Sequence, residues 1–112
     1  DSVTSIDAHQ LQQKMLDASL SILDVRKTNE FLSGHILGAK NIPLYYINDQ
    51  YAELDPKETY YIHCAGGYRS MIMASLLKSK GFIKLVDIQG GFKAIATSSI
   101  PTSEYLCPST LN

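Results

Sequence analysis

The feature that most constrains the fold is an alternation of short apolar segments with segments of helical periodicity. The apolar segments predict strands over residues 3–6, 20–25, 39–42, 60–63 and 83–86. The intervening segments predict helices over residues 8–18, 28–32, 44–54, 70–80 and 92–97. Strands that alternate with helices favour a mainly parallel sheet covered by helices on both faces. The chain is therefore predicted to have an α/β fold.

Local signals mark the edges and faces of these helices. Asp7, with Gln10 three residues later, is typical of a capping box at the start of the first long helix. In the helix expected from residue 70, the large aliphatic side chains are predicted to form the buried face. These side chains are Ile72, Leu76 and Leu77.

Size and charge exclude several classes of function. With 112 residues and 12.4 kDa, the chain favours one domain, which we place at residues 1–100, with residues 101–112 as a C-terminal tail. The net charge of −1 gives no long-range attraction for nucleic acid or an anionic membrane surface. No apolar run approaches the ~20 residues that a membrane span needs. Neither nucleic acid nor a membrane is expected as a partner.

The two cysteines, Cys64 and Cys107, are too few for a disulfide framework. They favour free thiols in a reducing compartment, so a cytoplasmic location is expected. No Cys or His pattern has zinc spacing, and no metal site is predicted. The role of Cys107 stays open, because it either resolves an intermediate on Cys64 as a disulfide or lies in a tail without a task.

The segment after the strand at 60–63 carries the candidate chemistry. Its residues are Cys64, Ala65, Gly66, Gly67, Tyr68 and Arg69. Ligands of parallel sheets bind beyond the carboxyl ends of the strands. The two glycines allow successive N–H groups to face one concavity, and the next helix adds its positive end. Such a cradle favours a thiolate, the nucleophilic form of cysteine, and Arg69 adds a cation for an anionic substrate.

A structural interpretation of Cys64 competes with this one, because free cysteines are commonly buried as small apolar residues. Two glycines and an arginine at a helix start are not needed for that purpose, and they favour the functional interpretation. Tyr68 is expected either to contact the substrate or to cover the loop.

Charged residues also lie at the end of the strand at 20–25. Asp24 and Arg26 are predicted to support the pocket, as a buried ion pair that fixes the loops in preference to lining its mouth. His35 is expected to be a structural hydrogen-bonding residue. His63 is expected to point to the opposite face from Cys64, which makes it a poor general base.

Five motifs in order resemble the rhodanese domain of the sulfurtransferase family. They lie at residues 22–26, 30–43, 61–70, 81–82 and 87–92, and so cover nearly the whole chain. The resemblance implies a three-layer sandwich with a central, mainly parallel sheet. In the related phosphatases the arginine follows the cysteine after five residues, whereas four separate Cys64 from Arg69 here. Phosphatase activity is therefore not expected.

The resemblance also implies a mechanism. Cys64 would take the outer sulfur of a donor such as thiosulfate, become a persulfide, and pass the sulfur to a thiol or to cyanide. Residues 65–69 would bind the substrate, and the cycle would need no metal and no organic cofactor. The alternative is a sulfur-carrier or regulatory module excised from a larger fusion protein, a hypothesis that the start at Asp1 instead of Met favours. A fused or partner domain, such as a metallo-hydrolase, is then expected.

Overall fold

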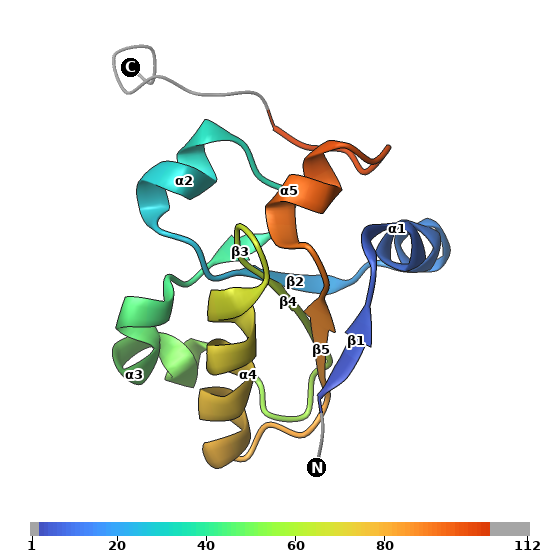
Figure 1. The fold of residues 1–112 in the computed structure, drawn as a ribbon. Coiled ribbons are helices and arrows are strands. Elements are labelled where there is room, and N and C mark those ends of the chain that lie inside the picture. The colour runs from blue at the N-terminus through green and yellow to red at the C-terminus, as the bar shows by residue number, and fades with distance from the viewer. Residues whose placement is uncertain (1–2, 104–112) are drawn as a thin grey trace.

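The computed structural model describes residues 3–103. Five strands form one sheet in the order β1-β5-β4-β2-β3, and every neighbouring pair is parallel. The strands are β1 (Thr4–Ile6), β2 (Ser21–Asp24), β3 (Lys40–Asn41), β4 (Tyr60–His63) and β5 (Leu85–Ile88). The predicted α/β fold with a parallel sheet is confirmed (Figure 1).

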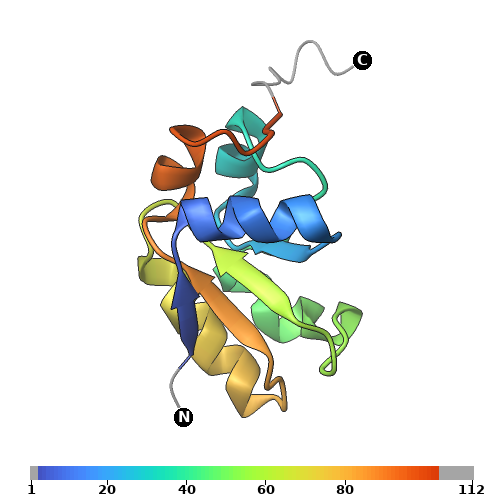
Figure 2. The same ribbon diagram turned by 90° about the vertical axis from the view of Figure 1, so that its right-hand side faces the viewer.

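Helices cover both faces of the sheet. They are α1 (Ala8–Asp17), α2 (Thr28–Ser33), α3 (Ile47–Gln50), α4 (Tyr68–Ser79) and α5 (Gly91–Ala96). Figure 2 shows α1 in front of the sheet and α4 behind it. Each face has its own buried cluster, one around Ile62, Met73 and Leu77 and the other around Leu11, Ile88 and Ile95. Within residues 3–103, every helix is too short or too polar to span a bilayer.

The alternation of side chains along β4 sets the two faces of the candidate site. Tyr60 and Ile62 belong to the cluster under α4, whereas Tyr61 packs against the cluster under α1 and α5. Because successive side chains of a strand point to opposite faces, Cys64 shares the α4 face with Ile62. His63 lies on the other face, where its ring stacks on Phe92, as predicted.

Three local predictions require correction. The helix expected over 44–54 is broken into two 3₁₀ turns (Leu44–Tyr46 and Tyr51–Glu53) around α3. Tyrosine, asparagine and aspartate are weak helix formers, and they are frequent in this segment. The last strand begins at Leu85, and Ile83 is 74% exposed.

The buried face of α4 is the third correction. It consists of Ser70, Met73, Ala74 and Leu77, while Ile72 is exposed. Leu77 is buried as predicted and Leu76 packs partly buried against the same cluster, so the prediction fails at Ile72 and omits Ser70, Met73 and Ala74. The capping box of α1 is confirmed, since the Asp7 carboxylate accepts the Gln10 N–H at 2.8 Å.

Residues 101–103 pair with residues 35–37. The Leu37 N–H donates to the Pro101 carbonyl at 3.2 Å, and Ile36 forms a β-bridge with Thr102. The division into residues 1–100 and a tail stays a prediction, and Cys107 lies outside the described residues.

Candidate active site

Cys64 directly follows β4 at the carboxyl edge of the sheet. Its side chain is 1% exposed and packs in the cluster under α4. The Gly67 N–H donates to the Cys64 sulfur at 3.0 Å, and the Ser70 hydroxyl lies 3.7 Å from the same sulfur. The sulfur is therefore held at the N-terminus of α4, where backbone N–H groups and the helix dipole stabilise a negative charge.

Gly67 is the residue whose backbone makes this contact possible. It is the N-cap of α4 with a φ of 108°, a left-handed conformation that favours glycine. Gly66 does not have a positive φ, so the predicted pair of permissive glycines reduces to one. Ala65 faces α5, and Tyr68 is 80% exposed at the first residue of α4. The substrate-binding role of residues 65–69 stays a prediction.

The start of α5 holds the Cys64 loop in place through two backbone hydrogen bonds. The Phe92 N–H donates to the Cys64 carbonyl at 2.7 Å, and the Lys93 N–H donates to the Ala65 carbonyl at 3.1 Å. Gly91 allows this approach, since a Cβ there would lie 2.4 Å from the Cys64 carbonyl oxygen. Gly91 and the first residues of α5 thus fix the backbone that carries Cys64.

Arg69 is engaged in an ion pair. Its two terminal nitrogens donate to the two carboxylate oxygens of Glu30 at 2.7 and 3.1 Å. The Arg69 hydrogen bond lowers the pKa of Glu30 to about 2. This bidentate pair connects the Cys64 loop to α2 and neutralises the cation that the sequence predicted for the substrate. Sequence reasoning gave Glu30 no role of its own.

Asp24 and Arg26 form the buried ion pair predicted for them. Arg26 Nη2 lies 2.7 Å from Asp24 Oδ2 and also donates to the Gly34 carbonyl at 2.7 Å. The guanidinium stacks over the Phe92 ring at 4.2 Å. His63 Nε2 lies 3.5 Å from the same carboxylate, and burial lowers the pKa of His63. This cluster faces away from the Cys64 sulfur.

His35 is the structural residue expected from the sequence. Its ring stacks on Phe31, and its Nδ1 lies 2.8 Å from the Phe31 carbonyl and 3.0 Å from the Ser103 hydroxyl. These contacts connect the C-terminal half of α2 to Ser103, the last of the described residues.

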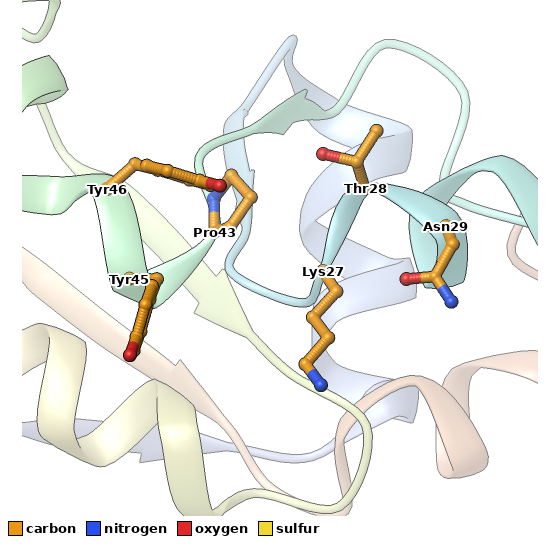
Figure 3. A pocket seen from close by; sticks show the side chains of 6 residues that line it. All are labelled: Lys27, Thr28, Asn29, Pro43, Tyr45 and Tyr46. Carbon is orange, nitrogen blue, oxygen red and sulfur yellow. The ribbon is translucent and has the colours of Figure 1, made fainter.

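A surface hollow lies beside the β2–α2 junction (Figure 3). It has a volume of about 490 Å³ and is lined by Lys27, Thr28, Asn29, Pro43, Tyr45 and Tyr46. A smaller hollow of about 120 Å³ shares Lys27, Pro43 and Tyr45 with it and also reaches Arg69. No carboxylate within residues 3–103 forms an ion pair with Lys27. Lys27 was missed because no motif distinguishes it from a surface lysine.

Two further polar residues lie buried behind Cys64. Ser70 is 0% and Asp87 4% exposed, and the Ser70 hydroxyl donates to Asp87 Oδ1 at 2.5 Å. Burial raises the pKa of Asp87. Sequence reasoning missed this pair, since Asp87 lies 17 positions after Ser70 and a single aspartate in an apolar strand is the available signal. In the described part of the chain, no group of three His, Cys, Asp or Glu side chains could hold a metal ion.

Comparison with known proteins agrees with this geometry. The family model described as Rhodanese-like domain matches residues 7–98. A rhodanese-like domain protein from Staphylococcus aureus superposes with a TM-score of 0.80 at 35% identity, covering 88% of this chain and 97% of that one. YrkF of Bacillus subtilis, named as a candidate sulfur carrier protein, is 36% identical over 82% of this chain and 50% of its own.

The thiosulfate sulfurtransferase GlpE of Stutzerimonas stutzeri is 29% identical over 70% of this chain and 72% of its own. This chain spans only 50% of the length of YrkF and 57% of the length of another curated relative that it matches. The similarity to those two therefore concerns one part of each relative.

Proposed function

Since the chain belongs to the family of rhodanese-like domains, we propose that it is a sulfurtransferase that carries sulfur as a Cys64 persulfide. The observation that carries the proposal is the Cys64 sulfur itself, held 3.0 Å from the Gly67 N–H at the start of α4. An N–H donor at this place stabilises the negative charge on the sulfur as it attacks and the persulfide anion that results.

In the first step, the Cys64 sulfur attacks the outer sulfur of a sulfane donor such as thiosulfate. The new sulfur–sulfur bond forms as the old one breaks, and sulfite leaves with the electron pair of the broken bond. In the second step, a thiol or cyanide attacks the outer sulfur of the persulfide. The Cys64 sulfur then leaves with its electron pair, and the resting protein is restored.

Support for an anionic donor comes from the smaller hollow, which Lys27 and Arg69 both line, and from the larger hollow that shares Lys27 with it. Among residues 3–103 the Lys27 ammonium has no carboxylate partner, whereas Arg69 is paired with Glu30. We propose that Lys27 draws the donor into the hollow and that Arg69 lines its inner end, beside the Cys64 loop. A volume of about 490 Å³ also accommodates a small organic donor or acceptor.

Intact-mass analysis after incubation with thiosulfate tests the proposal. The wild type should gain one sulfur, which cyanide then removes, and Cys64→Ala should gain none. Cys107→Ser is the matched control and should gain one sulfur as the wild type does. Absence of the added sulfur in the wild type, or its persistence in Cys64→Ala, would overturn the proposal.

A sulfur-carrier module is the second candidate, favoured by the similarity to YrkF and by the part of YrkF that this chain spans. A carrier accepts sulfur on Cys64 but turns over slowly with small acceptors. Rapid thiosulfate:cyanide turnover would support the enzyme, and loading without turnover would support the carrier. A cytoplasmic location stays a prediction.

A further inference from the structure

The proposed sulfur transfer makes no use of Ser70 and Asp87, the two buried polar residues behind Cys64. Both project toward the interface between α4 and the sheet, where apolar side chains would pack without a desolvation cost. A carboxyl group in such a place has a cost in stability, and its position beside the reactive sulfur gives it a chemical use.

The hydrogen bonds run in one direction, from the thiol to the carboxylate. The Cys64 thiol donates toward the Ser70 oxygen at 3.7 Å, and the Ser70 hydroxyl donates to Asp87 Oδ1 at 2.5 Å. The Gly67 carbonyl is an alternative acceptor for the hydroxyl, at the longer distance of 3.3 Å. A chain of donors of this kind can move a proton from sulfur to carboxylate without displacement of a heavy atom.

Asp87 is suited to accept a proton. On β5 it pairs with Ser5 of β1 and Ile62 of β4, and α4 presents Ser70 to it. None of the charged side chains in the described part of the chain forms an ion pair with it. Burial raises the pKa of Asp87 more than the Ser70 hydrogen bond lowers it, so the protonated form is favoured relative to an exposed carboxyl group.

We propose that Asp87, acting through the Ser70 hydroxyl, takes up the Cys64 proton when the sulfur attacks and keeps it while Cys64 carries the persulfide. The proposal rests on the proposed function and deepens it. Loading with thiosulfate then converts the thiol and the carboxylate into a persulfide anion and a carboxylic acid, and sulfite leaves as the dianion. When cyanide attacks the outer sulfur, thiocyanate leaves and the proton returns through Ser70 to the Cys64 sulfur.

Electrostatic repulsion explains why the proton would stay on Asp87 while Cys64 carries the persulfide. A persulfide anion and an ionised Asp87 would place two negative charges at either end of one buried hydroxyl group. Arg69, the nearest cation of the loop, is already bound to Glu30. Protonation of Asp87 leaves one negative charge, which the Gly67 N–H and the start of α4 stabilise. Asp87 thus acts on the sulfur only through Ser70, whose hydroxyl group contacts the reacting sulfur.

Alkylation of Cys64 by iodoacetamide, followed by peptide mass, measures this proton transfer separately from sulfur transfer. The reagent is neutral and contains no sulfur, so the result does not depend on the proposed donor. In the wild type, the rate should rise with pH in two steps, first as Asp87 ionises and then as the thiolate forms. Asp87→Asn should lose the first step and react at least about tenfold more slowly at pH 6.

A second variant separates the hydroxyl bridge from the charge. Ser70→Ala keeps the Asp87 carboxylate but breaks the chain, so it should also lose the low-pH step, while Ser70→Thr should restore it. Asp17→Asn and Ser75→Ala are exposed controls and should behave as the wild type.

The result that overturns the proposal is an Asp87→Asn rate at pH 6 equal to or above that of the wild type. Asp87 would then act only as a charge that opposes the thiolate. If circular dichroism shows that Asp87→Asn does not fold, Ser70→Ala decides by the same measurement. If the wild type gains no sulfur from thiosulfate but shows the two-step alkylation profile, the proposed sulfurtransferase function is refuted and the proposed proton transfer still stands.

Discussion

The carboxyl ends of β2 and β4 lie side by side, yet they are built in opposite ways. Asp24 and His63 are paired in the sheet register, and the Val25 N–H donates to the His63 carbonyl at 3.0 Å. At the end of β2, buried side chains satisfy one another through the Asp24–Arg26 pair. At the end of β4, the Cys64 sulfur receives a backbone N–H and lies against a hydroxyl group, and both can serve a new anion. The end of β2 is thus fixed by its own ion pair, whereas the groups around Cys64 at the end of β4 can form hydrogen bonds with a new anion.

The largest effect is expected from breaking the fixed end. Asp24→Asn leaves the buried Arg26 guanidinium without its counter-charge, so we expect a loss of about 3–5 kcal/mol in the free energy of unfolding. Urea denaturation measures it, with the exposed Asp17→Asn as control. A loss below about 1 kcal/mol would show that the ion pair does not fix this end of the sheet.

A smaller loss is expected where α5 fastens the Cys64 loop. Gly91→Ala places a Cβ 2.4 Å from the Cys64 carbonyl oxygen at a φ of +57°. We expect a loss of about 1–3 kcal/mol in the free energy of unfolding, together with slower persulfide formation, because the loop backbone must move. Gly81→Ala is the matched control, since its φ is +97° but nothing lies within 4 Å of the added carbon. Equal losses in the two variants would refute the contact and leave only backbone strain.

His63, at the end of β4, makes the stability of the folded chain depend on pH. Burial lowers the pKa of His63 below its ordinary value of 6.5, so the unfolded chain binds a proton that the folded chain resists. The stability is therefore complete above pH 6.5 and falls as the pH drops below it, with a slope that approaches about 1.4 kcal/mol per pH unit.

Unfolding of wild type and His63→Gln from pH 8 to pH 5 measures this contribution. The wild type should lose stability over that range, and the variant should lose less. Parallel curves would mean that the buried imidazole does not titrate in the folded chain. Glu30 contributes in a separate window, because its lowered pKa makes its stabilising effect disappear only below about pH 4.5.

The fold could be predicted from the sequence because local patterns and the global fold agree there. β4 was assigned over 60–63, and the Asp7–Gln10 box was found from its spacing alone. The buried face of α4 could be found only in part. Leu77 is buried as expected, but Ser70 and Ala74 are buried although neither side chain is large and apolar, so hydropathy does not single them out.

The candidate site could likewise be predicted only where its residues are neighbours in the sequence. Cys64 and its loop are contiguous in sequence, so their chemistry was visible in one segment. The partners that alter that chemistry are remote, since Arg69 lies 39 positions after Glu30 and Asp87 lies 17 positions after Ser70. A contact between distant segments depends on the register of the sheet, which hydrophobic periodicity does not specify at the level of a single side chain.

The smallest effect is expected at the ion pair between α2 and the Cys64 loop, and it tests most directly whether the ends of β2 and β4 differ. Glu30→Gln removes the carboxylate that neutralises Arg69. The loop then presents a free cation beside the hollow that Lys27 also lines. We expect the KM for thiosulfate to fall about two- to threefold at low ionic strength and the difference to vanish in high salt, as screening requires. Glu53→Gln breaks a pair with Lys40 that does not involve the Cys64 loop and should leave KM unchanged. A KM that rises in Glu30→Gln would mean that the carboxylate holds Arg69 in position instead of competing for it, so that the loop at the end of β4 would be as firmly fixed as the end of β2.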